Sequence, residues 1–234
     1  MASTRDILRG PARVQSGSAL VGASILGADF ARLADDTASA VDAGCELLHV
    51  DVMDGHFVPN LSMGPAVCAA ARRAFPDVSI DVHLMVTDPA DYVAPFRDAG
   101  ADHVTFHAEV GDVDGAVKLG EAIRAAGMTS GLSVKPGTDL EPWLGVFGAF
   151  DMALVMSVEP GFAGQSFIDG AVDRIAAIAA TAHRPRWISV DGGVGQTNSG
   201  ACRAAGCNYL VAASSIYREP PYQRGSAVRA LAGG

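Results

Sequence analysis

Apolar and polar positions along the chain alternate in blocks that predict strands separated by helices. Four times, a helix-like stretch ends in Ala-Gly and an apolar run follows within three residues. A glycine just past a helix end enters the left-handed conformation that other residues avoid, so each Ala-Gly predicts a helix end. The four stretches are DAGCELLHVDV (42–52), DAGADHVTFH (98–107), AAGMTSGLSV (125–134) and AAGCNYLVAAS (204–214).

Strands and helices alternate strictly in this prediction. The expected strands are 20–26, 47–53, 79–86, 103–107, 130–134, 152–158, 186–191 and 209–214. The expected helices are 30–43, 64–74, 89–99, 113–126, 139–147, 169–182, 196–205 and 222–231. Strict alternation implies a parallel sheet, and eight units fit a single-domain α/β fold, the (β/α)8 TIM barrel. A doubly wound sheet is the alternative. We expect residues 1–19 to form a loose N-terminal tail and residues 20–234 to form the barrel.

Polar side chains occupy one face of three of these strands. Residues two apart in a strand point the same way, and here the opposite face is uniformly aliphatic. In a barrel the aliphatic face meets the helices, so we expect the polar face to point inward at the carboxyl-terminal mouth. The polar faces carry His49, Asp51 and Met53, then Asp81, His83 and Met85, then Ser189 and Asp191.

Four of these residues form a candidate metal site. Two imidazoles and two carboxylates are good ligands for a divalent ion such as Zn, Fe, Mn or Co, and their spacing does not choose among the four. Separate hydrogen-bonded polar groups in the core are the alternative. The two carboxylates also suggest a proton-transfer pair acting through an enediolate, which a metal would stabilise. The four residues are His49, Asp51, His83 and Asp191.

Three glycine-rich or small-residue turns follow the last three strands, in VEPGFAGQSF (158–167), DGGVGQT (191–197) and AASSIY (212–217). Such turns at consecutive strand ends predict a phosphate site built from backbone N–H groups. Three methionines, Met53, Met85 and Met156, are interpreted either as a cap of sulfur atoms over an enediolate or as flexible core filler.

Composition narrows the classes of partner. The chain has 234 residues, is 49% hydrophobic and carries a net charge of −9 without blocks of like charge. This argues against disorder and against a nucleic-acid or anionic-membrane partner. The sequence contains no run of about 18 apolar residues, so we expect no membrane span. The four cysteines form no CxxC pair and the N-terminus lacks an apolar signal, so we expect a cytoplasmic protein. The sequence leaves open whether it forms a homo-oligomer.

These motifs resemble the ribulose-phosphate 3-epimerase family. The resemblance rests on SILGADF (24–30), HVDVMDGHFVPNLSMGP (49–65), DVHLMV (81–86), VEPGFAGQSFI (158–168) and VDGGV (190–194). It implies a TIM-barrel isomerase of carbohydrate metabolism, in the pentose phosphate pathway, that interconverts D-ribulose 5-phosphate and D-xylulose 5-phosphate. Asp51 and Asp191 would be the acid/base pair as well as metal ligands. The implied substrate contacts are Ser24, His83, Gly161, Phe162, Ala163, Gly164, Gln165, Asp191, Gly192, Gly193, Ala213 and Ser214.

Ala23, Ala163 and Ala213 depart from the family pattern, which has Pro, Gly and Gly at these places. The departures concern the substrate more than the reaction, so an epimerase of a related ketose phosphate such as D-allulose 6-phosphate is an alternative. A phosphate-binding barrel without turnover is another. A decarboxylase or an indole-forming barrel would need a catalytic lysine, and Lys118 and Lys135 are the only lysines in the chain.

Overall fold

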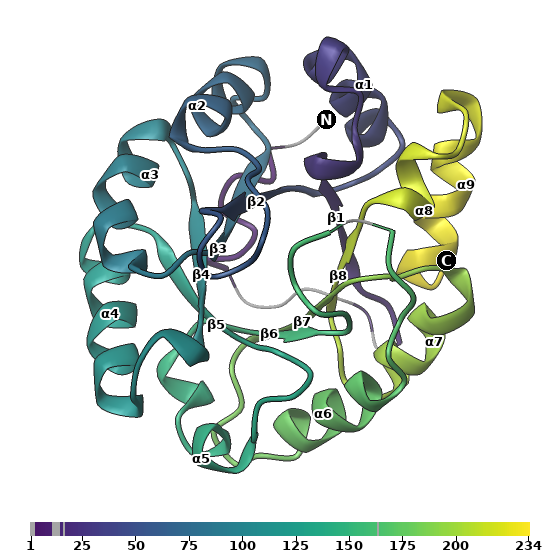
Figure 1. Cartoon of the computed structure of the whole chain (residues 1–234). Helices are drawn as coiled ribbons and strands as arrows, with labels where there is room; N and C mark the ends of the chain where they lie inside the picture. Colours follow the sequence, from purple (N-terminus) through teal and green to yellow (C-terminus); the bar gives the residue numbers. More distant parts are fainter. Residues whose placement is uncertain (1–2, 11–14, 16, 163) are drawn as a thin grey trace.

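Eight parallel strands close into a barrel in the order of the chain, and β1 pairs with β8 to complete the ring (Figure 1). The computed structural model describes residues 3–10, 15, 17–162 and 164–234. This closure confirms the predicted barrel and excludes the doubly wound alternative, in which the sheet stays open. The strands are β1 (Leu20–Ser24), β2 (Leu47–Met53), β3 (Ser79–Met85), β4 (His103–His107), β5 (Thr129–Val134), β6 (Met152–Met156), β7 (Trp187–Asp191) and β8 (Tyr209–Ala212).

Helices surround the barrel, and the Ala-Gly signal marks their ends correctly. Gly44, Gly100, Gly127 and Gly206 all have left-handed φ angles, between 90° and 109°. In the described part of the chain, no helix is long and apolar enough to cross a membrane. The helices are α1 (Leu33–Asp42), α2 (Pro65–Ala74), α3 (Val93–Ala99), α4 (Val113–Ala125), α5 (Glu141–Leu144), α6 (Gly170–Ala179), α7 (Gln196–Ala204), α8 (Ser214–Tyr217) and α9 (Pro221–Ala232).

Several elements differ in extent from the prediction, most clearly the helix after β5 and the last strand. The helix expected over 139–147 is only the single turn α5, followed by a 3-10 turn at Phe147–Ala149, because Gly145 and Gly148 weaken helical backbone. The last strand stops at Ala212 rather than at Ser214, since Ser214 already begins the short helix α8.

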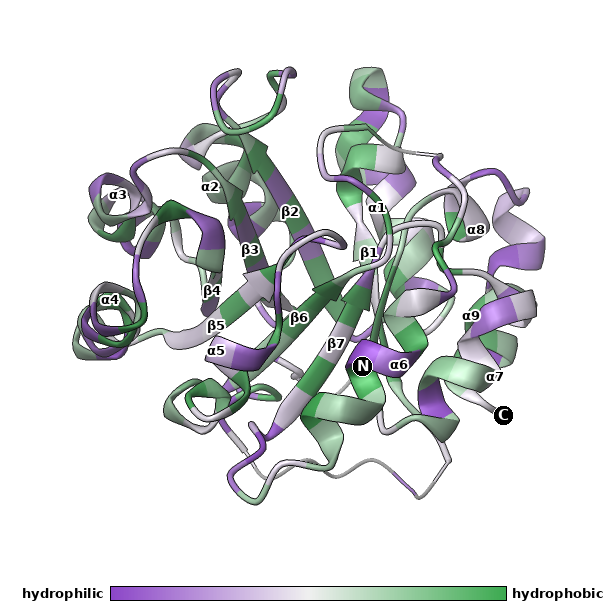
Figure 2. Ribbon diagram, turned by 60° about the horizontal axis from the view of Figure 1, so that its bottom comes forward, coloured by the Kyte–Doolittle hydropathy of each residue, from purple (hydrophilic) through white to green (hydrophobic). Residues whose placement is uncertain are grey.

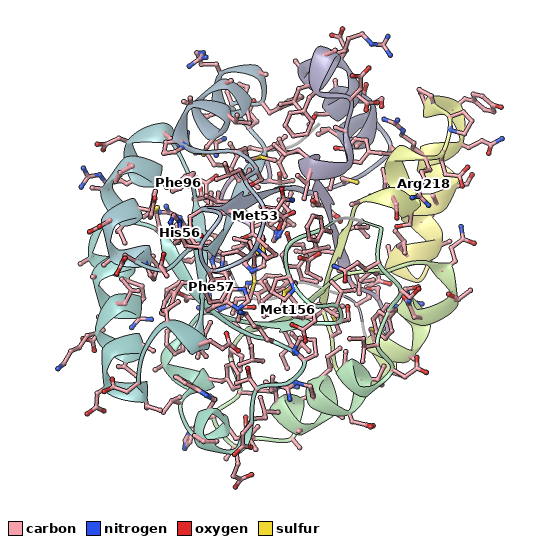
Figure 3. All side chains as sticks on the ribbon, viewed as in Figure 1. Met53, His56, Phe57, Phe96, Met156 and Arg218 are labelled. Carbon is pink, nitrogen blue, oxygen red and sulfur yellow. The ribbon has the colours of Figure 1, made fainter. Side chains whose placement is uncertain are left out.

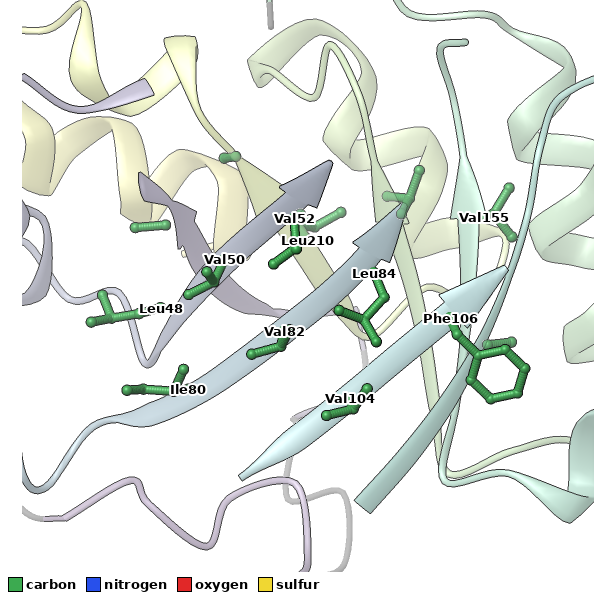
Figure 4. Packing of buried hydrophobic residues seen from close by; sticks show 14 of the residues in the cluster. Leu48, Val50, Val52, Ile80, Val82, Leu84, Val104, Phe106, Val155 and Leu210 are labelled. Atoms are coloured by element: carbon green, nitrogen blue, oxygen red, sulfur yellow. The ribbon is translucent and has the colours of Figure 1, made fainter. Parts of the chain in front are cut away.

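The main core lies between the outer faces of the strands and the helices, as the alternation predicts. Figure 4 shows aliphatic side chains of β2, β3 and β4 lined up on this face, among them Val50, Val82 and Val104, all fully buried. Hydrophilic residues concentrate on the outer helices and loops, while the strands are mostly hydrophobic (Figure 2). A shift of one residue in any strand would exchange its two faces, so this core also fixes which side chains point inward.

The N-terminal segment 3–10 packs across the amino-terminal end of the barrel, so this part of the tail is not loose. Leu8 is 1% exposed and packs in a cluster with residues of β1, β2, β6, β7 and β8. Trp187 Nε1 donates a hydrogen bond of 3.2 Å to the Leu8 carbonyl. Thr4 bonds the carbonyls of Glu46 and Asp77. The segment therefore covers the end of the barrel that lies opposite the catalytic mouth of such folds.

Because Leu8 is buried in this cluster, we expect Leu8→Ala to lower the free energy of unfolding by about 2–5 kcal/mol. Leu61→Ala makes the same chemical change at a side chain that is 74% exposed, and should change stability by less than about 0.5 kcal/mol. Urea unfolding followed by circular dichroism measures both. Equal effects of the two substitutions would show that the segment adds nothing to the folded barrel.

Candidate active site

An open cavity lies at the carboxyl-terminal mouth of the barrel. Its walls come from the ends of β1, β2, β3, β6, β7 and β8 and from the loops that follow them. Met53 and Met156 lie near the centre of the barrel in Figure 3. Most of the predicted site residues line this cavity: Ser24, Asp51, Met53, Met85, Met156, Gly161, Phe162, Gly164, Gln165, Asp191, Gly192, Gly193, Ala213 and Ser214.

The four predicted metal ligands come together in one cluster. One donor atom from each of His49, Asp51, His83 and Asp191 lies within 4.8 Å of the others. Asp51 Oδ1 is 3.2 Å from His49 Nε2 and 3.2 Å from His83 Nδ1. Asp191 Oδ2 is 4.0 Å from His49 Nε2 and 3.7 Å from His83 Nδ1. Strand register produces this arrangement, because Asp51 of β2 pairs directly with His83 of β3.

His49 is held from below by a buried carboxylate. Its Nδ1 lies 2.8 Å from Asp81 Oδ2, which also accepts a hydrogen bond of 2.8 Å from the Tyr209 hydroxyl. Since a carboxylate only accepts, the imidazole proton belongs on Nδ1, and Nε2 faces the cluster. Nε2 is fully buried and forms no hydrogen bond with any described residue. A lone pair that is buried, oriented and unpartnered in this way suits a metal bond.

Neighbouring charges favour the charged forms of both His49 and Asp51. Burial opposes a charged His49, but Asp51 and Asp81 outweigh it and raise the pKa of His49 well above its usual value. A metal would replace that proton, because only a neutral imidazole can be a ligand. Burial likewise opposes ionisation of Asp51, yet the two histidines hold its pKa far below the ordinary range.

Asp191 differs from Asp51 in its surroundings. Burial, together with repulsion from Asp51, raises the pKa of Asp191 to about 6. Its side chain is 16% exposed, whereas that of Asp51 is 6% exposed and accepts a hydrogen bond of 2.6 Å from the Ser24 hydroxyl. The cluster therefore contains one carboxylate that is held ionised and one that protonates easily.

The donor set fits a divalent transition metal. A tetrahedral ion with bonds of about 2.0–2.1 Å needs ligand atoms roughly 3.3 Å apart. The four measured distances between imidazole nitrogens and carboxylate oxygens, 3.2 to 4.0 Å, bracket that value. Nitrogen and carboxylate oxygen together suit Zn, Fe, Mn and Co alike, so the four residues could hold a divalent metal, and the geometry does not choose the ion.

The three methionines surround the mouth of the cluster. Met53, Met85 and Met156 are 6%, 1% and 2% exposed, and all three line the cavity. Met53 and Met85 pair across β2 and β3, two residues beyond Asp51 and His83. Their weakly hydrogen-bonding sulfur atoms give this part of the cavity an apolar wall.

The other side of the cavity is built from tightly turned backbone. Gly192 and Gly193 have left-handed φ angles of 112° and 60°. A Cβ atom on Gly193 would lie 2.7 Å from Gln165 O and from Phe167 N, so only glycine lets the loop after β7 approach the loop after β6 this closely. The Gln165 amide donates to the carbonyls of Glu159 and Phe162 and thereby shapes the second loop.

Of the two alanine departures in these loops, only Ala213 can be described. Ala213 has φ −115°, which needs no glycine, and its methyl group lies opposite Gly27. Ala163 lies outside the described residues. The sequence analysis did not identify Arg218, which lies beside the loop after β6. Its guanidinium is 3.3 Å from where a Cβ atom on Gly164 would be.

The model of the ribulose-phosphate 3 epimerase family matches residues 20–217, nearly the whole barrel. The chain belongs to this family. The ribulose-phosphate 3-epimerase of Mycobacterium tuberculosis is 44% identical over 222 residues, which cover 93% of this chain and 95% of that protein. The ribulose-phosphate 3-epimerase of Escherichia coli K12 is 42% identical over 210 residues, covering 88% and 92%. These similarities make this member of the epimerase family an isomerase.

Solved structures of other enzymes share the fold of the epimerase family. The 3-hexulose-6-phosphate synthase of Salmonella typhimurium aligns with a TM-score of 0.69 at 18% identity, covering 91% of this chain and 96% of that one. The 3-keto-L-gulonate-6-phosphate decarboxylase of Vibrio cholerae aligns with a TM-score of 0.69 at 10% identity, covering 92% and 95%. At this identity the likeness shows the barrel alone.

Because His49 Nε2 is the unpartnered atom of the cluster, we expect His49→Ala to weaken zinc binding by more than about 100-fold, beyond the loss typical of residues that only support a ligand. His56→Ala is the control, since His56 is exposed and its ring contacts only the Asp54 carbonyl among the described residues. Competition with a chromophoric chelator measures both affinities. Zinc binding that is unchanged in His49→Ala would exclude this cluster as the metal centre.

Proposed function

We propose that this protein is a metal-dependent 3-epimerase that interconverts D-ribulose 5-phosphate and D-xylulose 5-phosphate. The observation that carries the proposal is the pair of carboxylates, Asp51 and Asp191, which cluster with two imidazoles and line the cavity at the barrel mouth. Family membership supports the same reaction, since the relatives in Mycobacterium tuberculosis and Escherichia coli carry this name.

Inverting a carbon that bears an acidic proton requires a base on one face and an acid on the other. Asp51 and Asp191 come from β2 and β7, so they approach the cavity from different strands. Their surroundings drive their pKa values apart, which suits one carboxylate to accept a proton while the other delivers one. In the reverse reaction the two exchange roles. The substrate passes through an enediolate, with C3 lying between the two groups.

His49, His83, Asp51 and Asp191 would hold the divalent ion, one of Zn, Fe, Mn or Co. When bound, such an ion supplies positive charge beside the substrate oxygens and so eases loss of the neighbouring proton. Met53, Met85 and Met156 would keep water and other proton donors away from C3, because their sulfur atoms offer no acidic hydrogen.

The turns after β6, β7 and β8 would bind the phosphate group. Gly164, Gly192, Gly193 and Ser214 line this part of the cavity, and backbone N–H groups there can reach an anion directly. We propose Gly161, Phe162, Ala163, Gln165 and Ala213 as further contacts of the substrate, with Ser24 holding Asp51 in place. All four cysteines are free and buried, which agrees with a cytoplasmic location.

The lysine-dependent alternatives lack a lysine in the right place. Lys135 Nζ lies over the Phe57 ring, 3.7 Å from its centroid, and is not among the residues that line the cavity. Lys118 lies on α4, outside the barrel. A barrel without turnover would have no need of paired carboxylates with such different surroundings.

The reaction is tested by incubating the zinc-loaded protein with ribulose 5-phosphate in D₂O and following C3 by NMR. We expect xylulose 5-phosphate to form with deuterium at C3, because the proton passes through a group that exchanges with solvent. A parallel incubation with allulose 6-phosphate measures substrate choice. Turnover of the hexulose phosphate alone would transfer the proposal to that substrate, and no exchange with either would refute it.

Asp191→Asn should lower kcat per bound zinc by about 10²–10⁴-fold, since an amide cannot deliver or accept the proton. Asp51 remains, so one of the two epimers should still exchange its C3 proton with D₂O without being inverted. Asp169→Asn makes the same change at an exposed carboxylate just before α6 and should leave kcat unaltered. Normal inversion by zinc-loaded Asp191→Asn would exclude the two-carboxylate mechanism.

A further inference from the structure

A chain of hydrogen bonds leads from the cluster of His49, Asp51, His83 and Asp191 to the loops that follow β4 and β5. His83 Nε2 lies 2.9 Å from His107 Nε2, and His107 Nδ1 lies 3.0 Å from Glu109 Oε2. The two imidazoles are fully buried and stack with their centroids 5.0 Å apart at 22°. Neither His107 nor Glu109 has a part in the proton transfer or the metal bonds proposed above.

Glu109 ends the chain as an anchored acceptor. Its Oε1 accepts a hydrogen bond of 2.8 Å from the Lys135 backbone N–H and another from the Thr138 hydroxyl. The Arg174 guanidinium donates to the carbonyls of the same two residues, so the loop after β5 that holds Glu109 is itself held by α6. The Glu109 side chain is 19% exposed and lies where the chain leaves β4.

Counting donors and acceptors fixes the direction in which each of these hydrogen bonds is donated. The Glu109 carboxylate can only accept, so the proton of a neutral His107 belongs on Nδ1, and its Nε2 is a bare acceptor. Two N–H groups cannot face each other across 2.9 Å, hence the single proton between the rings belongs to His83 Nε2. His83 Nδ1 faces Asp51 and Asp191 and lies 3.2 Å from Asp51 Oδ1, so it is the nitrogen that a metal bound between these carboxylates would meet in place of a proton.

We propose that His107 and Glu109 are positioning residues that fix the tautomer and the ring orientation of His83 so that Nδ1 binds the metal. The inference rests on the proposed metal centre and assigns it a supporting pair on β4 and the turn after it. Asp81 does the same for His49 in one step, with the opposite ring nitrogen left for the metal. Such outer partners typically account for 10–100-fold in metal affinity.

Glu109→Gln tests the direction of the chain with almost no change of shape. The Lys135 N–H can only donate, so it keeps the amide oxygen of Gln, and the NH₂ group then faces His107 Nδ1. His107 would have to carry its proton on Nε2, opposite the proton of His83. We expect zinc to bind 10–100-fold more weakly, measured by chelator competition. Asp139→Asn removes the same charge from an exposed residue of the same loop and should change the affinity less than two-fold.

His107→Phe is a second variant that tests the same contact independently, in case Glu109→Gln does not fold. Phenylalanine can keep the stacking on His83 and the tilted ring contact with Phe57 but offers no nitrogen. His83 Nε2 therefore loses its acceptor, and zinc affinity should fall in the same way. Circular dichroism establishes that each variant is folded. Long-range ¹⁵N–¹H spectra of the zinc-loaded protein, labelled at histidine, should place the protons on His83 Nε2 and His107 Nδ1, a readout that a merely structural role does not predict.

The outcomes separate the two proposals. Wild-type protein that binds zinc and epimerises ribulose 5-phosphate, while Glu109→Gln binds zinc as Asp139→Asn does, overturns the positioning role alone. A wild-type His107 proton on Nε2 also overturns it. Wild-type protein that neither binds zinc nor epimerises refutes the proposed function, and the positioning role with it.

Discussion

Imidazoles and carboxylates inside a closed barrel must find partners there, and this constraint connects the fold to the site. His49 and His83 are fully buried, and an unpaired polar group at that depth costs several kcal/mol. Each is paired across strands, His49 with Asp81 and His83 with Asp51, and these pairs are neighbours in the β2–β3 register. The aliphatic core outside the barrel fixes that register. The outer core therefore determines that both imidazoles point inward to the cluster.

The parts of this arrangement that depend on local periodicity could be predicted from the sequence. The two-residue period of β2, β3 and β7 gives the inward face, and barrel closure brings the strand ends together. His49, Asp51, His83 and Asp191 follow from those two facts. Strand lengths were harder, since β6 ends at Met156 rather than at Val158. Ser157 leaves the ladder to bond the carbonyls of Asp191 and Gly192 with its hydroxyl.

The partners behind the ligands could not be predicted, because they depend on distances between strands that sequence spacing does not contain. The alternation in β3 shows that Asp81 shares the inward face with His83. Its hydrogen bond to His49 appears only once β2 and β3 are paired. Tyr209 is a core aromatic by pattern, and only the closed barrel brings its hydroxyl to Asp81. Leu8 lies in a segment with no periodicity at all, so its burial depends entirely on tertiary contacts.

The two ends of the cavity are built by different physics and tolerate change differently. At the end with the His/Asp cluster, the proposed function depends on which atoms carry protons, so replacing one oxygen by nitrogen, as in Glu109→Gln, would act on the cluster from a distance. At the other end, an anion would meet backbone N–H groups, whose position depends on φ and ψ rather than on side-chain identity. Ala213 has a negative φ of −115°, which does not require glycine, whereas a Cβ atom on Gly193 would lie 2.7 Å from the backbone of Gln165 and Phe167. Recognition by backbone N–H groups would also let a chain of net charge −9 bind phosphate without a basic surface.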